Sequence, residues 1–244
     1  MFEIVAHRGV PTETPENTIP SFLQAVELGA DAIEFDVRLT ADNIPVVYHY
    51  FYLDVITTLP GPIFAYSFEQ LQNAQSLDGQ DFSIPRLDEV LATVGGKIGL
   101  ELEMKGPEPH AAAIIAPVLD RYQSLWDTIE VTSYEPMLLK DIKQRCPGLV
   151  TDLLFPRSEA WMGLDVVTYT AIQRTRLAGA RAVHLHPTQL SVQVVEKIRA
   201  AGLEIHAWEV NDEASLQLVS ALNIPRLCTD DLRQALEFRT GVIR

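Results

Sequence analysis

Short apolar runs alternate along the chain with segments of helical periodicity. The runs are rich in branched apolar side chains, which favours strands, and in the segments between them apolar residues recur with the spacing of a helix face. The expected strands are 2–6, 32–39, 98–104, 129–132, 149–155, 182–185, 204–208 and 226–229. The expected helices are 19–28, 87–94, 109–125, 136–145, 171–178, 192–201, 215–222 and 232–238. This alternation predicts parallel strands joined by right-handed crossovers.

Eight strand and helix units of this kind close naturally into a (β/α)8 TIM barrel. The chain has 244 residues, and such a barrel typically needs ~250. A doubly wound open sheet is the competing arrangement, but its Gly-rich dinucleotide-binding loop is missing after the first strand, where His7-Arg8-Gly9 stands instead. No sharp change in composition suggests a second domain. We therefore expect one α/β barrel domain over residues 1–244.

The segment 50–83 departs from the alternation, because it shows little periodicity. Pro60-Gly61-Pro62 marks a turn within it, and 68–77 could form a short helix. We interpret the segment as a short insertion after the second strand that lies over the functional site.

Two carboxylates interrupt the apolar strand 32–39. Glu34 and Asp36 are two positions apart, so an extended backbone directs both side chains to the same face. Like charges on a buried face repel each other and are costly to desolvate, so they need a proton or a cation. A divalent metal ion would satisfy both carboxylates. The alternative is a half-exposed strand with a solvated acidic face.

Two histidines and an arginine stand where other strands are expected to end. His7 and Arg8 follow the first strand, and the apolar run 45–48, taken as an extension of the second strand, leads to His49. In barrels of this class the functional groups lie at the C-terminal ends of the strands. His7 and His49 could therefore act as an acid and base pair, with Arg8 making a forked contact to a phosphate between them.

The strand 98–104 contributes a second acidic face. Glu101, Glu103 and Lys105 lie on one side of it, and Glu103 could complete a three-carboxylate site with Glu34 and Asp36. A site made of carboxylates alone favours a hard cation, Mg²⁺ or Ca²⁺, over zinc. Lys105 would lie just beyond the metal.

The overall charge narrows the choice of ligands. The chain has 19 Lys and Arg against 33 Asp and Glu, a net charge of -14. Nucleic acid is bound by clustered basic residues, so this balance argues against a nucleic-acid partner. A small phosphorylated ligand is compatible with it, because a few basic residues and a metal can reverse the field locally.

Cysteine content and apolar runs give expectations about location. Cys146 and Cys228 are too few and too far apart for a disulfide framework or a zinc site of their own. No run approaches the ~18 apolar residues of a membrane span, and the N-terminal sequence MFEIVAHRG does not resemble a secretory signal. We expect a cytoplasmic protein without an integral membrane segment, and the oligomeric state is left open.

Several motifs occur in a fixed order over nearly the whole chain. They are His7-Arg8-Gly9, Pro15-Glu16-Asn17-Thr18, Gly29-Ala30-Asp31 with Glu34 and Asp36, 46–49, Ile84-Pro85-Arg86-Leu87-Asp88-Glu89-Val90-Leu91, 100–105, Ser133, Trp208 with Val210-Asn211, and Thr229-Asp230. This series closely resembles the glycerophosphodiester phosphodiesterases, whose fold is a (β/α)8 barrel with a short insertion after the second strand.

The resemblance implies a reaction and a role for each site residue. The metal ligands would be Glu34, Asp36 and Glu103, the acid and base would be His7 and His49, and the phosphate and substrate contacts would come from Arg8, Lys105 and Trp208. In the family, a glycerol hydroxyl of the substrate attacks phosphorus, and water opens the resulting cyclic phosphate. The products are sn-glycerol 3-phosphate and an alcohol. Which histidine is the acid and which the base is not readable from the sequence.

Three departures from the family pattern concern the surroundings of the site. Tyr50 follows His49 where Asp is usual, and Val55-Ile56 stand where an Arg is usual before the paired threonines. Glu101 stands where relatives often have Asn, and we interpret it as a solvated neighbour of the metal, with a further ligand as the alternative.

The remaining histidines and Ser133 are interpreted without a catalytic role, and two alternative functions stay open. His184 and His206 are interpreted as packing residues, while His186 could face the site, and Ser133 is a polar contact without a base to make it a nucleophile. The alternatives to the leading function are a lysophospholipase D type enzyme that accepts lipid-tailed substrates and a barrel that binds a phosphodiester without cleaving it.

Overall fold

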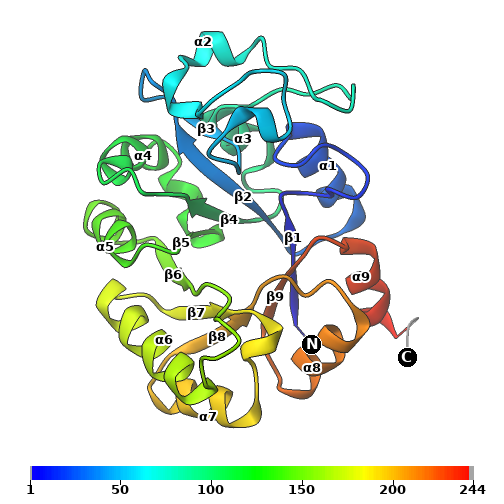
Figure 1. Ribbon diagram of the computed structural model, residues 1–244, viewed down its shortest axis with the longest axis vertical. Helices are drawn as coiled ribbons and strands as arrows, with labels where there is room; N and C mark the ends of the chain where they lie inside the picture. Colours follow the sequence, from blue (N-terminus) through cyan, green and yellow to red (C-terminus); the bar gives the residue numbers. More distant parts are fainter. Residues whose placement is uncertain (1, 242–244) are drawn as a thin grey trace.

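A closed barrel of parallel strands forms the body of the protein in the computed structural model, which describes residues 2–241 (Figure 1). The strands are β1 (Glu3–His7), β2 (Ala32–Leu39), β3 (Pro45–Val47), β4 (Gly99–Met104), β5 (Ile129–Ser133), β6 (Val150–Leu154), β7 (Ala182–Leu185), β8 (Glu204–Ala207) and β9 (Arg226–Thr229). Their order is β1-β9-β8-β7-β6-β5-β4-β2-β3, and a further β1–β2 pairing closes the ring. The predicted TIM-type barrel is confirmed, and the open doubly wound sheet is excluded.

The helices lie around the outside of the barrel (Figure 1). They are α1 (Ile19–Leu28), α2 (Phe68–Leu71), α3 (Leu87–Val94), α4 (Ala111–Asp120), α5 (Pro136–Arg145), α6 (Leu164–Ala178), α7 (Val192–Ala200), α8 (Glu213–Ala221) and α9 (Leu232–Thr240). Short 3-10 turns are η1 (Leu53–Val55), η2 (Ile63–Ala65), η3 (Gln123–Thr128) and η4 (Pro187–Gln189). Across residues 2–241, no helix has both the length and the apolar character that crossing a membrane requires.

Strand β2 shows how alternation separates the core from the site. All eight of its residues are buried. Phe35 points outward and packs against Phe22 of α1, with their ring centres 5.7 Å apart. Its sequence neighbours Glu34 and Asp36 therefore point into the barrel, since successive side chains alternate between the two faces. The interpretation of β2 as a half-exposed strand with a solvated acidic face is wrong.

Several expected elements have different bounds in the structure. The helix expected over 109–125 is divided into α4, which ends at Asp120, and the 3-10 turn η3. The run 45–48 does not extend the second strand, because it turns back as β3 and pairs antiparallel with β2, Val47 opposite Val37. Helix α6 begins at Leu164 rather than at 171. Its first turns contain β-branched residues of low helix propensity, but they are helical because Val167 is buried in the core and Thr168 Oγ1 donates to the Leu164 carbonyl at 2.5 Å.

The segment 50–83 lies beside β2 and β3, because η2 contacts β2 and the segment's own apolar cluster includes Val46 of β3 (Figure 1). Together with flanking residues, this cluster contains Val46, Tyr48, Leu53, Ile63, Leu71, Ala74 and Ile84. The helix expected over 68–77 is reduced to α2, which Ser67 caps by accepting from the Gln70 amide. That the insertion and the barrel form one domain stays a prediction.

A close contact at Gly9 fixes the loop that follows β1. Gly9 has a φ of 90°, and a Cβ there would lie 2.3 Å from Ser21 Oγ. That hydroxyl accepts from the Val10 amide at 2.7 Å and donates to the Arg8 carbonyl at 3.3 Å. The contact therefore sets the backbone directly after His7 and Arg8.

We expect Gly9→Ala to lower the free energy of unfolding by ~3 kcal/mol, about 1 from the left-handed backbone and about 2 from overpacking against Ser21. Gly29→Ala is the matched control, because Gly29 has a φ of 84° and a Cβ added there would meet no atom of residues 2–241 within 4 Å. Gly29→Ala should lower the free energy of unfolding only by the ~1 kcal/mol that comes from the left-handed backbone. Urea unfolding of both variants measures the difference, and equal losses would show that the Ser21 contact does not matter.

Candidate active site

Three buried carboxylates meet at the C-terminal ends of β2 and β4. The two strands pair in parallel with Asp36 opposite Glu103. One oxygen from each of Glu34, Asp36 and Glu103 can be chosen so that all three lie within 4.8 Å of one another, and none of the residues is more than 6% exposed. We call these three residues the upper cluster. The structure thus brings together the carboxylates that the sequence suggested.

Asp36 is the most strongly fixed member of the upper cluster. Lys105 Nζ lies 3.3 Å from its Oδ1, and Arg8 Nε lies 3.3 Å from its Oδ2. Asn17 holds it from a third side, because its Nδ2 donates to Oδ2 at 2.8 Å and its Oδ1 accepts from the Asp36 amide at 3.2 Å. Burial alone would raise the pKa of Asp36, but Lys105 and Arg8 outweigh burial and hold that pKa well below its usual range.

The other two carboxylates carry more negative charge than their neighbours compensate. Burial, with Asp36 adding to it, raises the pKa of Glu103 from 4.5 to about 7 even though Lys105 Nζ lies 2.9 Å from its Oε1. Burial, followed by Asp36 and Glu103, raises the pKa of Glu34 well above its usual value. Asp36 Oδ1 is buried and has no hydrogen bond from any described residue. An all-oxygen set that lacks positive charge fits a hard divalent cation.

His7 is held at the end of β1 by an acidic residue from the other end of the chain. Its Nδ1 lies 2.6 Å from Asp230 Oδ1, and its Nε2 lies 3.8 Å from Glu34 Oε2. Asn211 fixes Asp230, because its side chain accepts from the Asp230 amide at 2.8 Å and donates to the carboxylate at 2.5 Å. With Nδ1 engaged by Asp230, the nitrogen that faces the upper cluster is Nε2.

His49 follows β3 and is largely enclosed. Arg38 Nε donates to the His49 carbonyl at 2.8 Å, and the Tyr50 ring meets the imidazole edge to face at 4.7 Å. His49 Nδ1 is buried without a hydrogen-bond partner in the described part of the chain. Burial lowers the pKa of His49 to about 3, although Asp36 acts in the opposite direction. The imidazole is therefore neutral at neutral pH and has a nitrogen lone pair to accept a proton.

Arg8 and Lys105 are fixed positive charges beside the upper cluster. Arg8 Nη1 lies 3.1 and 3.2 Å from the two oxygens of Glu16, in addition to its contact with Asp36. Burial alone would lower the pKa of Arg8, but Asp36 and Glu16 raise it above its ordinary value. Both cations thus stay charged where the developing charge of a phosphoryl group would need them.

Aromatic residues border the upper cluster on the side of β5 and β8. Trp208 meets the Tyr134 ring at 6.1 Å and the His186 ring at 5.5 Å, and Lys105 Nζ lies 5.9 Å from the centre of the Tyr134 ring. A small cavity of about 30 Å³ contacts Glu34, Glu103, Tyr134 and Trp208, and a larger one of about 240 Å³ contacts Glu103, Lys105 and Tyr134. His186 lies beside Trp208, and its Nε2 is 3.4 Å from Glu209.

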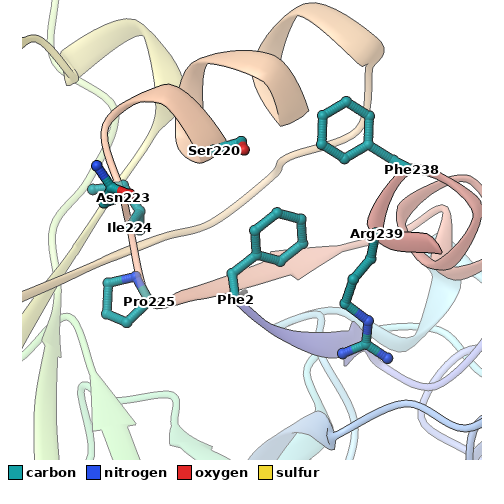
Figure 2. Close-up of a pocket in the computed structure, with 7 residues that line it drawn as sticks. All are labelled: Phe2, Ser220, Asn223, Ile224, Pro225, Phe238 and Arg239. Carbon is teal, nitrogen blue, oxygen red and sulfur yellow. The ribbon is translucent and has the colours of Figure 1, made fainter. Parts of the chain in front are cut away.

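The cavity of about 480 Å³ shown in Figure 2 is lined by none of the candidate active-site residues. It lies between α8, α9 and the start of β1 and β9. Its lining consists of Phe2, Ser220, Asn223, Ile224, Pro225, Phe238 and Arg239. None of these seven residues is a carboxylate or a histidine, so we do not place the active site there.

Two further side chains near the site, Glu101 and Ser133, can be compared with their expected roles. Glu101 is not solvated: it is 2% exposed, and its oxygens lie 3.5 Å from His184 Nδ1 and 3.4 Å from Arg226 Nη2. The interpretation as a solvated neighbour is wrong, because the barrel interior takes up this inward-pointing side chain. Ser133 Oγ donates to the Met104 carbonyl at 2.7 Å, which agrees with a polar contact.

Three residues complete the site but were given no role from the sequence. They are Asn17, Tyr134 and Asp230. Asn17 and Asp230 occur in the motifs of the resemblance, which was the available signal, but their partners Asp36 and His7 are 19 and 223 residues away in sequence. Tyr134 follows Ser133 directly and carried no signal.

A family model and the relatives found by sequence comparison all indicate the same protein family. A model of the glycerophosphoryl diester phosphodiesterase family matches residues 7–234. A glycerophosphodiester phosphodiesterase of Caldanaerobacter subterraneus is 28% identical over 242 residues, which cover 93% of each protein. Glycerophosphodiester phosphodiesterase 1 of Bos taurus is 27% identical over 241 residues, which cover 86% of this chain and 73% of the bovine protein.

Solved structures share the whole barrel. A phosphodiesterase of Oleispira antarctica, in complex with its product sn-glycerol-3-phosphate, has a TM-score of 0.85 at 26% identity and covers 98% of this chain and 96% of its own. A glycerophosphodiester phosphodiesterase of Agrobacterium tumefaciens has a TM-score of 0.76 at 26% identity, with 94% and 96% covered. The family model spans more than half of this chain, which therefore belongs to the glycerophosphoryl diester phosphodiesterase family.

Proposed function

We propose that this phosphodiesterase hydrolyses glycerophosphodiesters to sn-glycerol 3-phosphate and an alcohol, with a divalent metal in the upper cluster and His7 and His49 in acid and base catalysis. The observation that carries the proposal is the convergence of three buried carboxylates beside two histidines at the C-terminal ends of the strands. The named product of the Oleispira antarctica relative supports the choice of substrate.

The oxygen ligands of the upper cluster suit Mg²⁺ or Ca²⁺. Glu34, Asp36 and Glu103 would hold the ion, which would polarise the phosphoryl oxygens and neutralise the charge that develops on them. Arg8 and Lys105 add fixed positive charge on the same side. The raised pKa of Glu103, caused first by burial and then by Asp36, supports this assignment, because a bound cation would stabilise the ionised carboxylate.

The two histidines differ in ways that support separate roles for them. His49 is neutral at neutral pH, so we assign it the removal of a proton from the attacking hydroxyl. His7 is oriented by Asp230 through Nδ1, so its Nε2 is the atom that would hand a proton to the leaving oxygen. Trp208 and Tyr134 would shield the reacting groups from bulk water.

A lysolipid is the second candidate substrate, and apolar exposure on the insertion favours it. Tyr52, Val55 and Phe64 are 53%, 49% and 44% exposed. Phe64 contacts Phe51 at 5.1 Å, and Phe51 lies against Arg38, the residue that holds the His49 carbonyl. An acyl chain could lie on these side chains. Turnover of lysophosphatidylcholine compared with glycerophosphocholine separates the two candidates.

The main test is release of glycerol 3-phosphate from glycerophosphocholine, followed by a coupled assay. We expect excess chelator to abolish release and either Mg²⁺ or Ca²⁺ to restore it, because the metal would neutralise charge on the phosphoryl group. Release that persists at full rate in excess chelator would overturn the metal-dependent reaction. Running the assay with each ion also decides between Mg²⁺ and Ca²⁺.

The pKa of Glu103 predicts a dependence of stability on pH in the chelated protein. Folding raises this pKa from 4.5 to about 7, so Glu103 adds stability while it is protonated and loses that contribution as the pH rises through about 7. We expect the Tm to fall by roughly 5 °C, about 2 kcal/mol, between about pH 5 and pH 8. Saturating Mg²⁺ or Ca²⁺ should reduce the fall, and Glu103→Gln should reduce it without metal. A Tm that does not change with pH in the chelated protein would contradict the raised pKa.

Replacing His49 tests the proposed base. We expect His49→Gln to lower kcat by ~10²–10⁴-fold, because proton removal from the attacking hydroxyl is lost, while calorimetry shows that sn-glycerol 3-phosphate still binds. His110→Gln is the matched control, since His110 is exposed directly before α4 and is given no role in the proposed reaction. Full turnover by the His49 variant would remove this residue from the mechanism.

A further inference from the structure

A second cluster of ligand-type side chains lies inside the barrel, apart from the upper cluster. Four consecutive strands contribute one residue each: Glu130 from β5, Asp152 from β6, His184 from β7 and His206 from β8. One potential ligand atom from each can be chosen so that all lie within 4.8 Å of one another, and all four residues are buried. We call these four residues the lower cluster.

The spacing of the lower cluster approaches that of a tetrahedral metal site. His184 Nε2 lies 3.4 Å from Glu130 Oε1 and 3.5 Å from Asp152 Oδ2. His206 Nδ1 lies 3.6 Å from Asp152 Oδ2 and 3.0 Å from His184 Nε2. Ligands ~2.0–2.1 Å from a tetrahedral zinc ion are ~3.3 Å apart. These four separations are within a few tenths of an ångström of that value, and Glu130 lies within 4.8 Å of both Asp152 and His206.

Both imidazoles have the outer partners that metal-binding histidines need. The far nitrogen of His184, Nδ1, lies 3.5 Å from Glu101 Oε1, and the far nitrogen of His206, Nε2, lies 3.6 Å from Glu204 Oε2. A carboxylate on the distal nitrogen fixes the ring and increases the basicity of the ligating nitrogen. Each ring is therefore oriented with its other nitrogen toward the centre of the cluster.

One oxygen in the lower cluster lacks a hydrogen-bond donor among the described residues. Arg181 Nη2 lies 2.5 Å from Glu130 Oε2 and 2.5 Å from Asp152 Oδ2, which holds both carboxylates in place. Glu130 Oε1 is buried and points toward His184, and within residues 2–241 it makes no hydrogen bond. A buried oxygen without a donor is costly, and a cation at the centre of the cluster would satisfy it.

The charges around the lower cluster leave room for two positive charges. Its two carboxylates have two acidic neighbours, Glu101 and Glu204, and the neighbouring basic side chains are Arg181 and Arg226. The four acidic and two basic groups sum to a net charge of -2. Burial alone would lower the pKa of His184, but Glu101, Asp152 and Glu130 raise it to about 10, so a bound metal ion would take the place of the proton on that imidazole. A cleft of about 320 Å³ reaches Glu130 and Arg181 from the N-terminal ends of the strands and gives an ion access.

We propose that the lower cluster binds a second divalent ion, a transition metal of which Zn²⁺ fits best, with Glu130, Asp152, His184 and His206 as its four ligands. Two imidazole nitrogens and two carboxylates select zinc-type ions, whereas the all-oxygen upper cluster selects hard ions. Four protein ligands make the site a structural one. It would join β5 to β8 across the β6–β7 ladder, whose register is Leu153↔Val183 and Leu154↔His184.

The test is a titration of the chelator-stripped full chain with Co²⁺, followed by visible absorption. Tetrahedral Co²⁺ absorbs far more strongly than six-coordinate Co²⁺ on oxygen ligands, so the upper cluster does not mask the signal. We expect a strong band that saturates at one Co²⁺ per chain and is displaced by Zn²⁺. His206→Gln should abolish the band. His186→Gln, which changes a histidine outside the cluster, should keep it.

Two outcomes would overturn the proposal: the stripped wild-type chain gives no strong band, or the band survives in His206→Gln. If that variant does not fold, as judged by circular dichroism, X-ray absorption of the wild-type chain with one equivalent of Zn²⁺ decides. Two coordinated imidazoles are expected there, and a spectrum without them would show that the lower cluster is only an internal ion-pair network. Neither result affects the proposed phosphodiesterase reaction, which rests on the upper cluster.

Discussion

The structure depends on how carboxylates are accommodated on the inner face of a parallel barrel. An inward-pointing acid shares a narrow interior with side chains of neighbouring strands, so an uncompensated charge there is costly. This chain buries two acidic sets, Glu34, Asp36 and Glu103 in one and Glu101, Glu130 and Asp152 in the other. Arg8 and Lys105 compensate the first set, and Arg181 and Arg226 the second. The ionised form of Glu103 remains the least stabilised by this compensation, since burial and Asp36 raise its pKa to about 7 despite Lys105.

The fold was predictable because, along nearly all of the chain, the hydrophobic periodicity and the length of each segment indicate the same type of element. Alternation along β2 directs Glu34 and Asp36 to one face, and this followed from the sequence alone. The structure adds that Phe35 points outward, against Phe22 of α1. The parts that were missed depend on tertiary contacts. Strand β3 exists because it pairs with β2, and the start of α6 is helical although its β-branched residues disfavour it. The local helix and strand propensities predict neither the pairing of β3 with β2 nor the helical start of α6.

The site was predictable where its residues share a strand or follow one directly. Glu34, Asp36 and Glu103 come from two adjacent strands, and the barrel rule brings their ends together. The orientation of His7 was not predictable, because Asp230 reaches it across the β1–β9 closure from 223 residues away. His184 and His206 were interpreted as packing residues for the same reason, since the acids around them come from other strands.

Glu101 links the two acidic sets and explains why the departure from the family pattern at this position matters. It lies opposite Glu34 in the β2–β4 ladder and is among the groups that raise the pKa of Glu34. It also contacts His184 and Arg226. A neutral Asn here would remove both effects: Glu34 would ionise more easily, and His184 would lose its outer carboxylate. Glu101 therefore couples the charge state of Glu34 to the charge near His184, because a cation held near His184 would offset the field that Glu101 exerts on Glu34.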